Sequence, residues 1–118
     1  MSNSSEIQRL QNEIYDLNAR KEKCNNAINQ VTAMCTEIET ARTKLNEARD
    51  YLSTEYMGKR TGKITDKMDV IDNNAITIKE LYANDMINDL KNLKYSIESQ
   101  IRRKREKIAD LKAESAGE

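Results

Sequence analysis

The chain has 118 residues, of which 34% are charged and 37% hydrophobic, and its acidic and basic residues balance to a formal net charge of zero. This length is enough for one domain. A net charge of zero gives no field that attracts nucleic acid or an anionic membrane, and no stretch approaches the roughly 18 apolar residues of a membrane span. We therefore expect no nucleic-acid partner and no membrane insertion.

A seven-residue repeat runs through the first half of the chain. Its members are Leu10, Leu17, Cys24, Val31, Ile38, Leu45 and Leu52. A heptad repeat places one narrow apolar stripe along a long helix, and such a stripe packs against another helix. After Cys35 the apolar spacing loses one residue, so that Arg42 and Arg49 occupy positions to which the earlier repeat points. This kind of stammer locally overwinds a coiled coil.

The second half carries a stripe of its own. Its members are Ile64, Met68, Ile71, Ala75, Ile78, Tyr82, Met86, Leu90, Leu93, Ile97, Ile101, Ile108 and Leu111. Between the two stripes, the segment from Tyr56 to Gly62 holds Gly58 and Gly62 and has strong helix-breaking character.

These patterns predict an all-α fold: a long, coiled-coil-like antiparallel two-helix hairpin that forms a single domain over residues 1–118. The expected elements are helix 1 at about 5–56, a turn at about 57–62, helix 2 at about 63–113 and a tail at about 114–118. In this register residue i faces roughly residue 120 − i.

Further apolar residues near the turn lie outside the two stripes. Helix 1 has a second row with a spacing of seven, which comprises Ala27, Met34, Ala41 and Ala48. In helix 2, Val70 and Leu81 lie about 90° to one side of the stripe, and Ile76, Ala83 and Ile87 lie about 140° to the other. One helix cannot cover both flanks, so we expect these residues to contact a partner in a larger helical bundle. The alternative is that they are scattered exposed apolar residues, which are normal singly.

No pattern in the sequence predicts catalysis. A catalytic site needs a positioned acid, base or nucleophile, and the chain has no His. Cys24 and Cys35 lie on the seam about 16 Å apart along one helix, which favours two small buried hydrophobes over a disulfide. Four acidic residues at helical spacing favour a solvated or partner-facing stripe over a metal site: Asp69, Asp72, Asp85 and Asp89. We expect no enzyme activity, no cofactor and no metal.

Two further segments bear on the location and the surface of the protein. The segment Met1–Glu6 lacks the basic and apolar regions of a signal peptide, so we expect a cytoplasmic protein, exported without a signal peptide if it leaves the cell with a cargo. The basic run Arg102–Arg105 is predicted to lie near Glu13 and Asp16. We interpret it as a solvated, partly self-paired face rather than a phosphate or lipid patch.

The turn and the whole pattern resemble two groups of small helical proteins. Two helices joined at Tyr56-Met57-Gly58 resemble the WxG (ESAT-type) hairpins of type VII secretion, with Tyr56 in place of the Trp. The chain as a whole is more similar to the small helical partner proteins of LXG-domain toxins, a domain-of-unknown-function family of Gram-positive bacteria. The similarity lies in the N-terminal Ile-x-x-Leu coil, the stretch from Leu45 to Ala48, the Tyr-x-Gly-Lys turn and the C-terminal Ile/Leu coil.

This resemblance implies a targeting or chaperone-like protein that binds the helical N-terminal LXG domain of a secreted toxin and supports its type VII export, often with a second small helical protein. The WxG family often carries Tyr-x-x-x-Asp/Glu after its second helix, whereas here Tyr95 is followed by Ser99 at that spacing. The resemblance therefore leaves the export signal to the cargo or the second partner. The alternatives are a self-assembling structural coiled coil, such as a homodimeric four-helix bundle, and a general helical chaperone.

Overall fold

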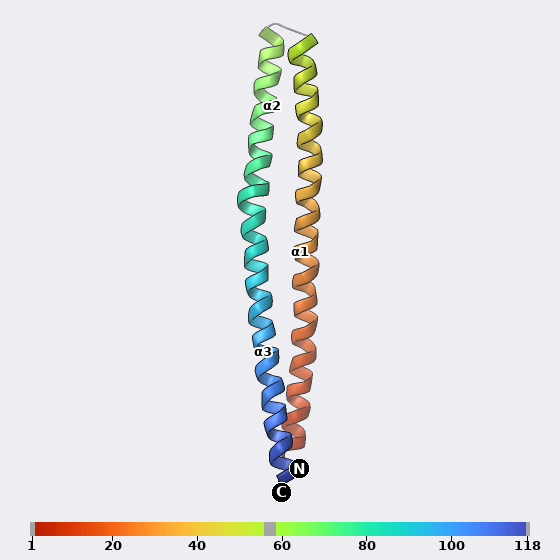
Figure 1. The fold of residues 1–118 in the computed structure, drawn as a ribbon, viewed down its shortest axis with the longest axis vertical. Helices are drawn as coiled ribbons and strands as arrows, with labels where there is room; N and C mark the ends of the chain where they lie inside the picture. Colours follow the sequence, from red (N-terminus) through yellow and green to blue (C-terminus); the bar gives the residue numbers. More distant parts are fainter. Residues whose placement is uncertain (1, 56–58, 118) are drawn as a thin grey trace. The chain divides into compact units, whose positions relative to one another are not determined.

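The computed structural model describes residues 2–55 and 59–117, and every one of these residues is helical (Figure 1). In chain order the helices are α1 (Ser2–Glu55), α2 (Lys59–Thr77), the π-helical segment η1 (Ile78–Ala83) and α3 (Asn84–Gly117). The last three follow one another directly, and α1 pairs with them in antiparallel fashion. The all-α helical hairpin predicted from the two stripes is confirmed.

Contacts between residues group the chain into two units. The terminal unit comprises Met1–Ile28 and Asp89–Glu118, and the central unit comprises Asn29–Asn88. Each unit contains part of α1 and part of the chain that returns beside it, so each has its own interface between helices.

The terminal unit has an apolar core between α1 and α3. Its buried side chains are Leu10, Leu17, Cys24, Ile97, Ile101 and Ile108. All of them are stripe positions predicted from the sequence, and Cys24 is a free, buried cysteine as expected. Fully burying a Leu or Ile side chain contributes about 1.5–3 kcal/mol, so this core is the main stabilising feature of the terminal unit.

Ion pairs between the helices fix the register of the terminal unit. Lys21 Nζ lies 3.4 Å from Glu98 Oε1, next to the position predicted from the antiparallel register. Lys104, in the basic run, donates a hydrogen bond to Glu13 Oε2 at 2.6 Å. This bond holds the pKa of Glu13 below its ordinary value. The basic run is thus partly paired with acidic residues of α1, as its position in the hairpin predicts.

Gly62 lies inside α2, so the prediction that it belongs to the turn is wrong. One glycine lowers helix stability by only about 1 kcal/mol relative to alanine, and Thr65 Oγ1 donates a hydrogen bond to the Gly62 carbonyl at 3.0 Å. No described glycine has a positive φ. The other two residues of the predicted turn motif, Tyr56 and Gly58, lie outside the described residues.

The chain from residue 114 to 117 is helical rather than a polar tail, because α3 extends to Gly117. The amide of Asn3 in α1 donates a hydrogen bond to Ser115 Oγ at 3.2 Å and another to the Leu111 carbonyl at 3.4 Å. Contacts between the helices therefore reach into a stretch whose composition alone predicts fraying.

The π-helical segment η1 was not expected from the sequence. Its hydrogen bonds run from residue i to i+5, so each turn holds more residues than an α-helical turn, and such segments are frequent at functional sites. Polar side chains bond to the backbone at both ends of η1. Thr77 Oγ1 donates to the Asn73 carbonyl at 3.1 Å, and Asn84 Nδ2 donates to the Glu80 carbonyl at 2.9 Å. These side chains satisfy carbonyls where the backbone pattern changes.

Replacing Gly62 by alanine should stabilise the protein. A Cβ added at Gly62 meets nothing within 4 Å, and alanine is favoured over glycine inside a helix by about 0.5–1 kcal/mol. Chemical denaturation followed by circular dichroism would measure this gain. The reverse change at an exposed position of α1, Ala33→Gly, should lower stability by a similar amount. A loss of stability in Gly62→Ala would mean that residue 62 needs a non-helical backbone.

Candidate functional site

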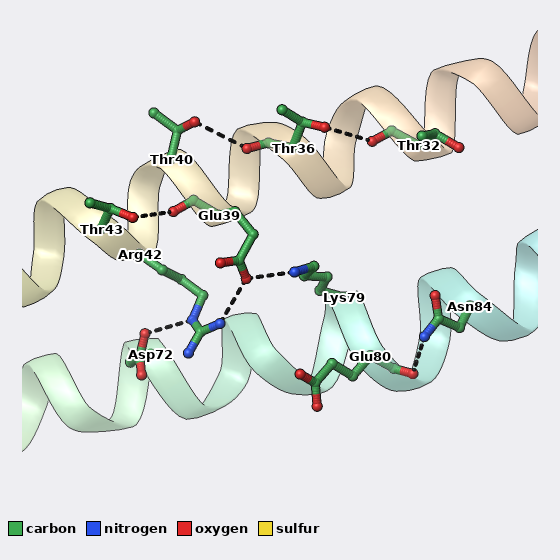
Figure 2. A network of polar contacts seen from close by, with 10 residues as sticks. All are labelled: Thr32, Thr36, Glu39, Thr40, Arg42, Thr43, Asp72, Lys79, Glu80 and Asn84. Atoms are coloured by element: carbon green, nitrogen blue, oxygen red, sulfur yellow. Dashed lines mark hydrogen bonds and ion pairs between the residues drawn. The ribbon is translucent and has the colours of Figure 1, made fainter.

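The central unit is held together by charged side chains where an apolar seam was predicted. Arg42 Nε on α1 lies 2.9 Å from Asp72 Oδ1 on α2, and Arg49 Nε lies 3.0 Å from Asp69 Oδ1. The second contact is an ion pair without hydrogen-bond geometry at Nε. Figure 2 shows the first of these pairs and its extension, in which Glu39 Oε1 contacts both Arg42 Nη1 and Lys79 Nζ at 2.7 Å.

This network explains the orientation of α2. Arg42 and Arg49 are half-buried whereas Ala41 and Ala48 are exposed, so α1 keeps its earlier heptad phase and the predicted stammer is wrong. A partly covered guanidinium needs a carboxylate partner. Asp72 and Asp69 supply these carboxylates, so the side of α2 that carries them faces α1. The stripe of large apolar residues on α2 is consequently turned away from the middle of the interface.

The network also shifts the pKa values of its members. The hydrogen bond from Lys79, and next the one from Arg42, hold the pKa of Glu39 below its ordinary value of 4.5. Asp72, followed by Glu39, raises the pKa of Arg42. Glu39 and Arg42 are therefore both charged at neutral pH.

The central unit exposes most of its large apolar side chains. Those on α2, η1 and the start of α3 are Ile64, Val70, Ile71, Ile78, Leu81, Tyr82 and Met86. Five of them belong to the stripe that was predicted to face α1, and the structure corrects this: Ile71, for example, is 58% exposed. Ala83 is the single buried apolar side chain in the described part of the central unit. The unit therefore lacks a closed apolar core of its own.

An apolar groove of about 270 Å³ runs between α1 and α2 in the central unit. Its lining residues are Ile38, Ala41, Arg42, Leu45, Ile71 and Ala75. The small side chains of Ala41 and Ala75 leave room beside Ile71, so the groove can accept a large side chain from outside. It is thus a candidate docking site for another helix.

Five of the residues predicted to contact a partner lie at the surface of the central unit. Val70 and Leu81 are 59% and 54% exposed, and Met34, Ala41 and Ala48 are exposed on α1. The groove brings Ala41 together with Ile71. Whether these residues bind a partner stays a prediction.

The predicted exposed row of Ile76, Ala83 and Ile87 is wrong at its centre. Ala83 is 1% exposed, and Ile76 and Ile87 are half-buried. These residues are seven and four positions from Ala83, a spacing that puts them on its buried side. Ile76 lies one turn after Asp72, whose side of α2 faces Arg42 on α1. Ala27 is half-buried and belongs to the terminal unit.

The terminal unit has a larger surface hollow, but its lining does not indicate a site. The hollow measures about 480 Å³, and its charged lining residues are Lys21, Glu98, Arg102, Arg105 and Glu106. These charges have both signs and Lys21 is paired with Glu98, which is typical of a solvated helix surface.

Two other kinds of site are absent from the described residues. No group of three or more His, Cys, Asp or Glu side chains among them could hold a metal ion. Within residues 2–55 and 59–117, no helix combines the length and the apolar character that crossing a membrane requires.

Glu39 should make the central unit sensitive to acid. Because its pKa is lowered in the folded protein, its stabilising effect is present above pH 4.5 and is lost as the pH falls through the lowered value. Thermal unfolding should show that Glu39→Gln melts below the wild type at neutral pH, and that the difference closes under acid conditions. The exposed Glu37 gives the matched control, Glu37→Gln. An equal effect of both variants at neutral pH would contradict a specific role of Glu39.

The fold and the geometry of this surface can be compared with what is known of other proteins. No family model, curated protein or solved structure matches the chain. The candidate site therefore rests on the residues and contacts of this chain.

Proposed function

We propose that the protein is a non-enzymatic accessory protein whose central unit binds helices of another protein. The observation that carries this proposal is the contrast between the two units. The terminal unit buries six large or medium apolar side chains between its helices, whereas the described part of the central unit buries only Ala83 and exposes nine large apolar side chains. A helix partner would supply the missing part of the core.

The outer edge formed by Val70 on α2 and Leu81 on η1 is the part of this surface best suited to a partner. Val70 and Leu81 are eleven residues apart, which is about three helical turns, so they lie on one side of the helix. Each is more than half exposed. Adjoining exposed apolar residues on a helix surface mark a site of protein interaction. The exposed row of Ile64, Ile71 and Ile78 lies beside this edge.

The resemblance described above supplies the class of the partner. We propose the helical N-terminal LXG domain of a secreted bacterial toxin, bound together with a second small helical protein, and a role in delivering that toxin to type VII export. A helix-on-helix interface suits this partner because an amphipathic helix presents apolar residues at i, i+3, i+4 and i+7 to a groove. In this proposal the protein stays in the cytoplasm or leaves it with its cargo.

Two charges placed on the outer edge of α2 should abolish binding of the LXG domain. Val70→Asp with Leu81→Asp puts carboxylates where apolar contacts form, and we expect an affinity at least about tenfold lower, which corresponds to about 1.4 kcal/mol. Helicity should be retained because both side chains are exposed. The measurement is calorimetric titration with a purified LXG domain, with circular dichroism as the test of folding.

The terminal unit offers a matched control for this experiment. Leu93 and Tyr95 are 51% and 69% exposed, so Leu93→Asp with Tyr95→Asp adds the same charge to a similar surface elsewhere. This variant should bind like the wild type. If the two double variants bind equally well, or if the wild type does not bind the LXG domain, the proposed function is wrong.

A further inference from the structure

Two rows of side chains with opposite sizes flank the groove of the central unit. On α1 the small side chains Ala41 and Ala48 are seven residues apart, and on α2 the large side chains Ile64 and Ile71 have the same spacing. Ala41 and Ile71 line the same groove. Ala48 is seven residues after Ala41, and Ile64 is seven residues before Ile71. Because the two helices are antiparallel, Ala48 and Ile64 lie at the same level.

The two rows are complementary to each other under one particular symmetry. A two-fold axis parallel to the helices places α1 of one copy against α2 of another at the same level. Ile71 of each copy then meets Ala41 of the other, and Ile64 meets Ala48. A two-fold axis that lies in the plane of the face and crosses the helices at the level of this pair would instead oppose Ala41 to Ala41 and Ile71 to Ile71, which leaves a void at one contact and a collision at the other.

Charges beside the rows fit the same symmetry. Lys67 lies one turn after Ile64 on α2, and Glu47 precedes Ala48 on α1. Both are exposed, and neither forms an ion pair within the described part of the chain. With the axis parallel to the helices, Lys67 of each copy faces Glu47 of the other at the rim of the contact. Charges that flank an apolar seam set partner choice and orientation in coiled coils.

We propose that a second copy of this chain covers the groove of the central unit and forms a two-fold four-helix contact with its axis along the helices. Each copy offers Ile64 and Ile71 to Ala48 and Ala41 of the other, which covers the groove and leaves Val70 and Leu81 exposed. This contact differs from the edge used in the proposed function, since Val70 lies about 100° around the helix from Ile71. The inference therefore does not rest on the identity of any other partner.

The test exchanges the sizes of the two residues that meet. Ala41→Ile puts two isoleucines together and Ile71→Ala leaves two alanines together, so each single variant should weaken self-association by about tenfold or more. The double variant restores one large and one small residue at each contact, and its dissociation constant should return to within about threefold of the wild type. Sedimentation equilibrium of the purified full chain, without any toxin, measures these constants.

Cysteine pairing tests the direction of the axis independently. In a Cys24→Ala, Cys35→Ala background, chains carrying Ala41→Cys should form disulfide-linked dimers when mixed with chains carrying Ile71→Cys, and should not do so alone. Circular dichroism of every variant checks that the helices are retained.

A monomer at about 100 µM would overturn the inference, as would a double variant that stays as weak as the single variants, or Ala41→Cys chains that crosslink among themselves. Any of these results would leave the proposed binding of an LXG domain through Val70 and Leu81 open to its own experiment.

Discussion

The pairing of Arg42 with Asp72 decides how the central unit is built. An arginine on the inner side of α1 has to be neutralised, and the carboxylate that does so comes from α2 at 2.9 Å. Glu39 and Lys79 extend the pair into a network across the helices. The side of α2 that faces α1 carries these aspartates together with the half-buried Ile76, while Ile64, Ile71 and Ile78 stay exposed.

The two units differ in how their helices are held together. The terminal unit follows a regular heptad pattern and buries leucines and isoleucines between its two helices. The central unit follows the same antiparallel pairing but uses ion pairs, which contribute little when partly solvated. The central unit is therefore poorly stabilised alone, and it exposes apolar side chains. Proteins commonly draw their binding regions from the less stable part of the fold for this reason.

The sequence predicts the terminal unit well and the central unit in part. Leu17, Cys24 and Ile101 are buried as the heptads require, and the register is close to the one deduced from equal helix lengths. The orientation of α2 was missed because periodicity identifies an apolar side but cannot tell whether a neighbour covers it. The missing signal was present in the chain: two arginines on one seam are matched by Asp69 and Asp72 on the other helix. The π-helical segment could not have been foreseen, since hydrogen bonds of that kind have no marker in residue type.

The π-helical segment also indicates where the sequence can lose a residue without disturbing the helix that follows. Within an α-helix, one inserted or deleted residue turns every later side chain by about 100°, and in α3 that would carry Ile97, Ile101 and Ile108 off the buried side. A π-helical turn already holds more residues than an α-helical turn. At Ile78–Ala83 the loss of one residue can be taken up by a return to α-helical hydrogen bonding, with the phase of the following helix kept. Related chains of unequal length should therefore differ at this segment before they differ in the helices on either side.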